Sequence, residues 1–281
     1  MNQTKTYKNQ IMFLDVRSRS YFCRSMLKMK QLFVVILLSV LTIQGVGQSA
    51  DSTSKPLNIN GNIGLTNNGI SIIPTFSLNA PAALFNFSIG KNRLSFDPDV
   101  RLTLDGRKGG MLFWFRYKFI QQKKFKLSAG IHPAYNFALR TITENGKSWQ
   151  ITQARRFIAW EINPTIIVSK HLSFTPYVLH GMGLQKDGPL STYFLAFNTN
   201  ISNLALGNHV KFSWTPQFYY LFMDGQKGLY MANNFRFSHN KLPFSLSSVT
   251  NKELKSNITG SKNFAWNIIL TYSFGHQFLR K

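Results

Sequence analysis

Two places in the sequence combine histidine with serine, and such pairs could support nucleophilic hydrolysis. His171 and Ser173 are two residues apart, while His209 and Ser213 fall on one face of a predicted strand. A hydrolase needs a serine, an imidazole and an orienting polar group together on one face. The first pair falls at a turn, and Lys211 lies between the members of the second pair. Neither pair completes the set.

A histidine and a carboxylate form a third candidate pair. We expect His132 and Glu161 on neighbouring strands with both side chains on one face, where Glu161 could orient His132 as a base. No serine is clearly placed beside them, and the sequence has no nucleophile elbow, phosphate loop or metal-ligand spacing. The sequence therefore predicts no catalytic residue, no metal site and no cofactor, and leaves a membrane-embedded lipid hydrolase as one alternative.

The elements that carry these residues are predicted to be β-strands. Apolar and polar residues alternate along most of the chain, for example from Val210 to Phe222, and a helical period of useful length is absent. This alternation predicts twelve strands, over residues 70–79, 82–90, 93–104, 110–119, 125–139, 154–168, 172–184, 191–203, 208–222, 228–238, 242–250 and 264–275.

The connections between the predicted strands alternate between short and long. The long ones include DGRKGG, TITENGKSWQITQ, QKDGP, DGQKG and NKELKSNITGSKN, and only NAP is tight on that side. Several strands exceed ten residues, whereas soluble strands average about five or six and a bilayer needs about 9–11. These features predict an all-β fold, an antiparallel up-and-down transmembrane β-barrel of about 12 strands. The alternative is a soluble β-sandwich.

The N-terminal part of the chain indicates export. The apolar run Leu32–Ile43 is too short to cross a bilayer as a helix, and basic residues precede it while small residues follow, as in a signal peptide. Cys23 precedes the expected cleavage site, so no disulfide is expected. We divide the chain into an over-extended gene start (1–28), a signal peptide (29–47), a periplasmic lead-in (48–69, with 57–66 as a further strand left open) and the barrel (70–281).

The strand alternation also assigns side chains to the two faces of the barrel. Outward positions are nearly all aromatic or aliphatic, and inward positions are polar. The basic side chains predicted to face the lumen are Arg93, Arg101, Arg116, Lys118, Lys126, Arg140, Arg155, Lys211 and Arg236, and the acidic ones are Asp97, Asp99 and Glu161. Two interpretations stay open: a salt-bridged network that stiffens a closed barrel, and a water-filled pore that prefers anions. Residues 140–153 could plug the lumen.

Prolines recur in the predicted strands that run toward the longer loops. Each lies in an apolar-x-Pro-x-apolar step, at Pro74, Pro98, Pro133, Pro176 and Pro216. Proline cannot donate a hydrogen bond to a strand ladder, so we expect each at an outward position beside a bulge or a strand start. We hypothesise that these prolines limit mispairing before the barrel closes.

The final predicted strand places Phe264, Trp266, Tyr272 and Phe274 on one face. It resembles the C-terminal strand of Gram-negative outer-membrane β-barrel proteins, although the chain continues with GHQFLRK. With the signal and the glycine-rich loops, the pattern is similar to that of uncharacterised porin-like barrels of Bacteroidota-type bacteria. The resemblance implies an outer-membrane location and recognition of the C-terminal strand by the barrel-assembly machinery.

The charge of the exported part is strongly positive. From Gln48 onward, 26 Lys and Arg stand against 9 Asp and Glu, a formal net charge of +17. Such an excess predicts an anionic partner, and we expect outer-membrane lipids and lipopolysaccharide rather than nucleic acid, for which no motif is present. We expect a small porin-like channel with a basic lumen, or alternatively a closed structural or assembly-associated barrel without transport.

Overall fold

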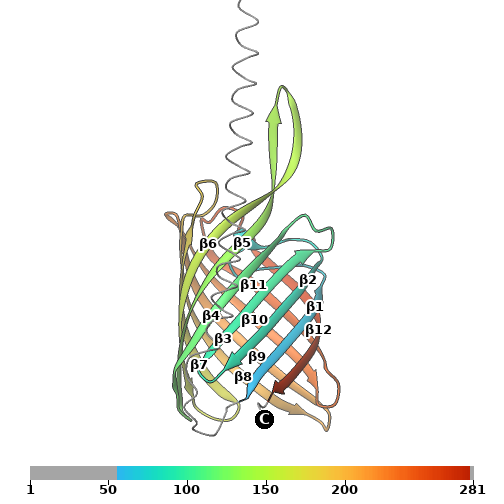
Figure 1. Ribbon diagram of the computed structural model, residues 1–281, viewed down its shortest axis with the longest axis vertical. Helices are drawn as coiled ribbons and strands as arrows, with labels where there is room; N and C mark the ends of the chain where they lie inside the picture. Colours follow the sequence, from blue (N-terminus) through green and yellow to red (C-terminus); the bar gives the residue numbers. More distant parts are fainter. Residues whose placement is uncertain (1–55, 279–281) are drawn as a thin grey trace, which may run out of the picture. The chain divides into compact units, whose positions relative to one another are not determined.

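The computed structural model describes residues 56–278, which form a closed barrel of twelve antiparallel strands (Figure 1). Each strand pairs with its neighbours in sequence, and β1 pairs with β12. The strands are β1 (Leu57–Thr66), β2 (Ala82–Lys91), β3 (Leu94–Thr103), β4 (Gly109–Gln121), β5 (Phe125–Glu144), β6 (Lys147–Ile167), β7 (Leu172–Gly183), β8 (Ser191–Leu206), β9 (Val210–Met223), β10 (Gln226–His239), β11 (Phe244–Ser256) and β12 (Phe264–Phe278). The predicted fold class is confirmed.

The barrel has two different ends. Leu57 of β1 lies opposite Phe278 of β12, and the connections at this end span two to four residues, so we call it the turn end. The opposite end, the loop end, carries the connection 67–81 with the short 3-10 helix η2 (Pro74–Phe76). Within residues 56–278, no helix is long and apolar enough to cross a membrane. The predicted gene start and signal peptide lie outside the described residues.

The first predicted strand is wrong. Residues 70–79 form part of the connection 67–81, whereas residues 57–66, which the sequence left open as a further strand within the lead-in, form β1 and close the barrel. The reason lies in the alternation itself. In LNINGNIGLT, Leu57, Ile59, Ile63 and Leu65 alternate with polar or small residues, while the apolar stretch that ends at Pro74 has no consistent period. The predicted number of strands was correct, but one of the twelve predicted strands was not.

Two predicted long loops are instead continuous hairpins. The strands β5 and β6 continue to a two-residue turn at Asn145–Gly146, and β9 and β10 meet at Asp224–Gly225. All four turn residues have positive φ, between 47° and 86°, as tight hairpin turns require. The β5–β6 hairpin projects beyond the loop end in Figure 1, so residues 140–153 do not plug the lumen as the sequence had suggested.

The two faces of the wall have opposite character, as the alternation predicts. Phe218 is 51% exposed on the outer face, whereas its neighbour Tyr219 is 1% exposed on the inner face. On β12, Trp266 is half exposed and Asn267 is buried. The outer surface therefore presents a band of aromatic and aliphatic side chains, which is the character that acyl chains require of a barrel exterior.

Four of the five predicted prolines lie in strands at an interruption of the ladder. Pro216 pairs with Asn233 of β10, while the pairing of β9 with β8 is broken between Gln217 and Trp214. In an antiparallel ladder the N–H of a residue points toward only one neighbouring strand, so the missing donor faces the broken side. The same one-sided break occurs at Pro98, Pro133 and Pro176. Pro74 differs from the prediction, because it is buried in η2.

An aromatic pair covers a glycine where the chain closes on itself. Gly61 of β1 lies between Phe87 of β2 and Phe274 of β12 on the outer face. The two phenyl rings meet edge to face with centroids 6.0 Å apart, and the Phe274 ring lies so close over Gly61 that no Cβ would fit there. Covering a strand glycine with a cross-strand aromatic ring stabilises pairing at that position.

We predict that Phe274→Ala weakens barrel closure. The change removes the ring pair and exposes Gly61, and we expect a loss of about 1–3 kcal/mol in unfolding free energy. Urea titration of the protein refolded into lipid vesicles measures the loss. Phe264→Ala on the same strand face, opposite Lys252 rather than a glycine, is the matched control and should cost less. Equal losses in the two variants would contradict the role assigned to Phe274.

Candidate functional site: the barrel interior

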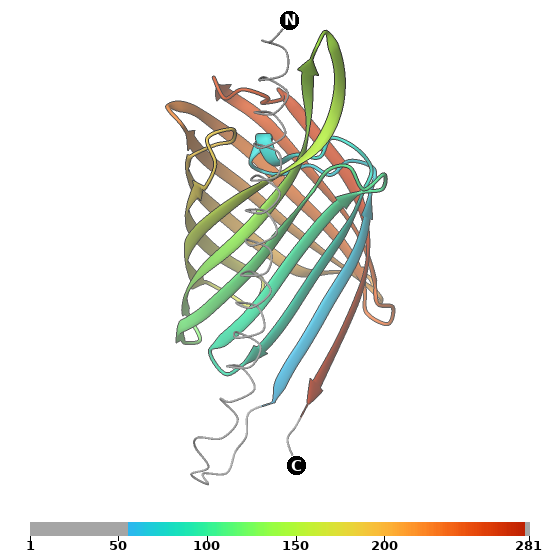
Figure 2. The same ribbon diagram turned by 45° about the horizontal axis from the view of Figure 1, so that its top comes forward.

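The connection 67–81, which we call the inserted loop, folds into the loop-end opening (Figure 2). Its tip reaches across to two distant strands. The Phe76 ring packs edge to face on Phe157 of β6 with centroids 5.2 Å apart, and the Thr75 hydroxyl lies 3.8 Å from the Met223 sulfur of β9. The inserted loop therefore narrows the lumen from within.

Hydrogen bonds hold the inserted loop in this position. Internally, the Gly69 N–H donates to the Ala80 carbonyl at 2.9 Å, and the Leu78 N–H donates to the Gly69 carbonyl at 2.7 Å. Toward the wall, the buried Asn267 amide donates to the Asn68 carbonyl at 3.0 Å. The loop is thus tied to β12, next to the seam that closes the barrel.

One side of the lumen is filled by apolar side chains. Large inward side chains of β8, β9 and β10 pack together near the loop end, with Tyr219 and Tyr230 stacked at 4.9 Å. We call this group the inner apolar cluster: Phe194, Ala196, Tyr219, Leu221, Met223, Tyr230, Ala232 and Ile258. Ile73 of the inserted loop packs against it. This cluster fills the lumen beside β8, β9 and β10, and the two larger cavities described below lie along the opposite wall.

That opposite wall carries a chain of charged hydrogen bonds at mid-height, which we call the charged belt. The Ser88 hydroxyl donates to Asp97, whose other carboxylate oxygen accepts from Arg116 Nη1 at 2.9 Å. Arg116 Nε donates to Glu161 at 2.6 Å, and the Tyr177 hydroxyl donates to the second Glu161 oxygen at 2.6 Å. The belt links β2, β3, β4, β6 and β7 across the inner surface.

A glycine makes the longest step of the charged belt possible. Arg116 and Glu161 lie opposite Gly130 on either side of β5, so their ion pair must cross that strand. A Cβ on Gly130 would meet Arg116 Cγ at 3.0 Å and Glu161 Oε1 at 3.2 Å. Because Gly130 has no side chain, the ion pair can pass over β5 and connect β4 with β6, which are not neighbours.

A second ion pair lies next to the belt. Arg101 donates from Nε and Nη2 to the two oxygens of Asp99, at 3.0 and 2.6 Å. The three predicted acids, Asp97, Asp99 and Glu161, thus all pair with Arg101 or Arg116. Three carboxylates against two guanidinium groups leave the middle of the lumen near charge balance, so this level does not carry the excess of basic charge that the sequence led us to expect.

The other predicted basic residues lie toward the two ends. Lys118, Lys126, Lys211 and Arg236 are exposed, share the inward parity of their strands and lie in the half of the barrel nearer the turn end. Arg93 precedes β3 in a turn rather than lying in a strand. Arg140 lies in the projecting part of β5, 3.7 Å from Asp187, and Arg155 is half-buried beside Gly188 near the loop end.

The candidate catalytic pairs are engaged elsewhere. His171 Nδ1 lies 2.8 Å from the Ser202 carbonyl oxygen, and the Ser213 hydroxyl accepts the Asn203 N–H at 3.0 Å. Both Glu161 oxygens are taken by the charged belt rather than by His132. His132 instead meets the Trp114 ring edge to face at 3.8 Å. Within residues 56–278, no group of three or more His, Cys, Asp and Glu side chains is placed to hold a metal ion.

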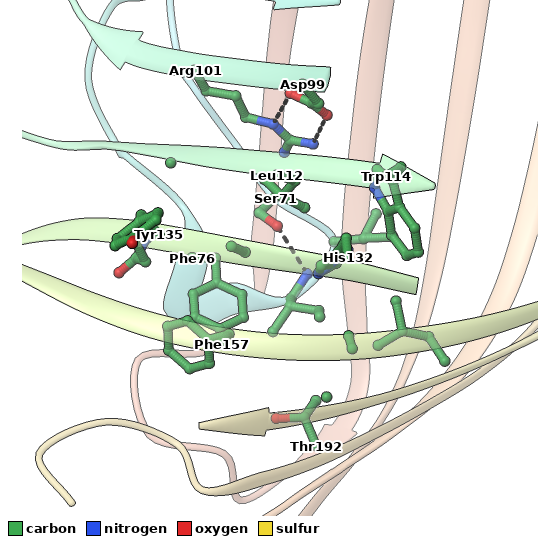
Figure 3. Close-up of a pocket in the computed structure, with 18 of the residues that line it drawn as sticks. Ser71, Phe76, Asp99, Arg101, Leu112, Trp114, His132, Tyr135, Phe157 and Thr192 are labelled. Carbon is green, nitrogen blue, oxygen red and sulfur yellow. Dashed lines mark hydrogen bonds and ion pairs between the residues drawn. The ribbon is translucent and has the colours of Figure 1, made fainter. Parts of the chain in front are cut away.

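Two cavities lie along the open wall. The loop-end cavity, about 330 Å³, lies beneath the inserted loop between Phe76, Trp114, Phe157 and Tyr177 (Figure 3). The turn-end cavity, about 380 Å³, is lined by polar residues of β1 to β4, including Asn60, Asn62, Asn86, Ser88 and Asp97. The two cavities share Asp99, Trp114 and Arg116 in their walls. The charged belt therefore stands where the two cavities adjoin.

Charges at the loop end are mixed. Asp105 lies in the connection 104–108, where the Thr103 hydroxyl and then the Arg107 N–H donate to its carboxylate and hold the pKa of Asp105 below its usual value. Glu144, Asp187, Asp224 and Glu253 also lie toward this end. Apart from Asp97, Asp99 and Glu161, which pair with Arg101 or Arg116, the acids of the described chain therefore lie near the loop end.

Sequence reasoning missed the inserted loop and the inner apolar cluster. The apolar run from Ile70 to Ile73 and the inward Tyr219 and Leu221 were the available signals, because both depart from a simple polar lining. An apolar residue where a polar lumen lining is expected indicates packing against another group within the lumen. The partner, a loop from the other side of the barrel, has no local signal.

The sequence matches no protein-family profile and no curated protein. Among solved structures, KdgM porin superposes with a TM-score of 0.46 at 10% identity, over 77% of this chain and 99% of that chain. NanC porin gives 0.43 at 11% over 77% and 98%, and the β domain of the Bordetella autotransporter BrkA gives 0.42 at 12% over 78% and 99%. At these identities the likeness concerns the barrel fold alone.

We predict that Arg116→Leu strongly destabilises the barrel. Glu161 is only 2% exposed, and removing its guanidinium partner leaves a buried charge, which costs about 3–5 kcal/mol. The double variant Arg116→Leu with Glu161→Leu removes both charges and should recover most of the loss. Urea unfolding of the refolded protein measures both effects, and a double variant as unstable as the single one would contradict the assignment.

Glycine variants provide the matched control for the crossing over β5. Gly130→Ala should weaken the Arg116–Glu161 pair, because its Cβ meets both partners and the Phe115 carbonyl oxygen at 3.0–3.2 Å. Gly181→Ala is also inward, but its Cβ meets only ordinary contacts of 3.7 Å or more and should be tolerated. Equal stability of the two variants would contradict the claim that the Arg116–Glu161 pair needs a glycine at position 130.

Proposed function

We propose that this protein is a small porin-like channel of the outer membrane that prefers anions. The observation that carries the proposal is the succession of two cavities along one wall, which adjoin at Asp99, Trp114 and Arg116. The inner apolar cluster and the inserted loop fill much of the rest of the loop-end half, which leaves a smaller cavity of about 160 Å³ between the loop and strands that include β11 and β12. A solute would therefore pass along the β2–β6 wall, past the charged belt.

The proposed anion preference rests on the turn-end half. Lys118, Lys126, Lys211 and Arg236 occupy inward positions there, and Arg93 adds a fifth basic residue at the turn before β3. Asp97, three residues from the turn-end start of β3, is paired with Arg116, and within residues 56–278 none of these five basic residues forms an ion pair with an acid. Rings of one charge at a pore wall raise the local concentration of the opposite ion, so chloride is favoured over potassium.

The apolar outer band and the basic turns support the proposed location. The turns carry Lys123, Lys124, Lys170 and Lys241 and no acid, and Lys91 ends β2 beside the first turn. Each such charge near an anionic lipid surface contributes about 1 kcal/mol. We place the turn end in the periplasm and the loop end outside, where lipopolysaccharide is the expected partner. The aromatic face of β12 is the part that we propose the assembly machinery recognises.

We predict discrete chloride-preferring conductance from the refolded protein in planar bilayers. Replacing Lys118, Lys126, Lys211 and Arg236 together by glutamine should lower the chloride-to-potassium permeability ratio by about twofold or more, because the wall charge is removed. Reversal potentials in a KCl gradient measure the ratio. The control variant replaces Lys91, Lys123, Lys170 and Lys241 by glutamine, which removes the same charge from the turns and should leave the ratio nearly unchanged.

The alternative is a closed structural or assembly-associated barrel, and the observation that favours it is the charged belt, which cross-links five strands. A correctly refolded protein that gives no conductance steps would contradict the channel and support the closed barrel. Release of fatty acid from labelled phospholipid or lipopolysaccharide would instead support the lipid hydrolase, although none of the three candidate pairs is assembled as such a site.

A further inference from the structure

The loop-end cavity differs from the rest of the proposed path. Its walls are mostly apolar and aromatic, with Phe76 and Phe157 at one edge and Trp114 at another, whereas the turn-end cavity is lined mainly by asparagine, serine and charged residues (Figure 3). A pore that passed only hydrated ions would have no use for an apolar chamber on its path. At about 330 Å³ the chamber is within the range of small-molecule sites, about 300–1,000 Å³.

The cavity also has polar groups at definite places. The Arg101 guanidinium lies at one edge, and its bonds to Asp99 use two of its five N–H donors. His132 lines the cavity and is 5% exposed, and its Nδ1 has no hydrogen-bond partner within the described part of the chain. A buried polar atom without a partner is uncommon and points to a missing hydrogen-bonding group.

We propose that the loop-end cavity is a binding site for small carboxylates with a planar apolar body, of the size of an aromatic monocarboxylate. This inference rests on the proposed channel and names its solute class. The apolar body lies between Phe76, Phe157 and Trp114, and the carboxylate accepts hydrogen bonds from the free N–H groups of Arg101. The solute then leaves the apolar chamber at the charged belt and enters the basic turn-end half, where its charge is again favoured.

Each part of the proposed solute complements one feature of the cavity walls. A small hydrophilic anion such as acetate would leave the aromatic surfaces unused. A neutral aromatic molecule would leave the Arg101 donors without an acceptor and would gain nothing from the basic residues beyond the belt. Only an amphipathic anion uses both, because aromatic and aliphatic walls favour burial of its body while a guanidinium favours a carboxylate by charge-assisted hydrogen bonding.

The test uses benzoate, with acetate and benzyl alcohol as the two matched controls. Isothermal titration calorimetry on the refolded protein in detergent measures binding without requiring conductance. We expect benzoate to bind at least about tenfold more tightly than either control, because only benzoate has both the ring and the charge. Benzoate binding no tighter than acetate or benzyl alcohol would overturn the inference.

Two variants locate the site. Gly181 faces the cavity, and a Cβ there makes only ordinary contacts with Ala159 and Thr192, so Gly181→Leu should fill the chamber without backbone strain and weaken benzoate binding about tenfold or more. The uncharged pair Asp99→Asn with Arg101→Gln should weaken benzoate binding about tenfold while leaving benzyl alcohol unchanged. Benzoate binding unaffected by both variants would place it elsewhere and overturn the assignment.

Conductance separates this inference from the proposed function. If the protein conducts chloride but benzoate binds no better than acetate, the channel stands and the carboxylate site is wrong. If benzoate binds in the cavity but the bilayer shows no conductance steps, the channel is wrong and the cavity is a binding site in a closed barrel. Where both hold, benzoate added at the loop end should interrupt the chloride current in the wild-type protein and not in Gly181→Leu.

Discussion

The pairing of β1 with β12 is the constraint on which the rest of the structure depends. In acyl chains no water is present to satisfy a backbone N–H or C=O group, and each unsatisfied group costs several kcal/mol. A sheet can therefore stand in a membrane only if its last edge meets its first. The register from Leu57–Phe278 to Thr66–Ile269 provides that meeting, and the Phe274 ring over Gly61 secures it on the outer face.

Closure then determines what the two faces must be. The outer positions have to be apolar, and the prolines are tolerated because each removes a donor only from an interrupted ladder. The inner positions are free to differ, and a barrel of twelve strands is narrow enough for side chains and one loop to fill much of it. Here the inner apolar cluster and the inserted loop occupy one wall, which leaves two cavities along the other, with the charged belt between them.

The sequence predicted the wall of this barrel well and its contents poorly, for physical reasons. Alternation is local, so the inward and outward faces of β9 and β12 could be assigned from neighbouring residues. The local pattern failed where a residue packs on a distant partner. Residues 70–79 looked like a strand because their partners, Phe157 of β6 for Phe76 and the inner apolar cluster for Ile73, cannot be seen from their own sequence. The two-residue turns at Asn145–Gly146 and Asp224–Gly225 were visible as hairpin dipeptides but were assigned to longer loops.

The sequence predicted which charged residues face the lumen but not how they pair in the charged belt. The sequence indicated that Arg116, Asp97 and Glu161 face the same lumen, and it could not indicate that Arg116 crosses β5 above a vacant Gly130. The inward charge was also expected to be basic throughout. In the structure the inward acids Asp97, Asp99 and Glu161 instead pair with Arg101 and Arg116, whereas Lys118, Lys126, Lys211 and Arg236 pair with no acid of residues 56–278.

The orientation of the tryptophans tests the central claim most directly, namely that one face of this wall is dissolved in acyl chains and the other encloses a lumen. Trp160, Trp214 and Trp266 lie at outward positions, and Trp114 is buried on the inner face. Single-tryptophan variants refolded into vesicles with brominated acyl chains should show strong fluorescence quenching for the three outward residues and little for Trp114. Quenching of Trp114 as strong as that of Trp160, or the absence of quenching at all four, would contradict the account.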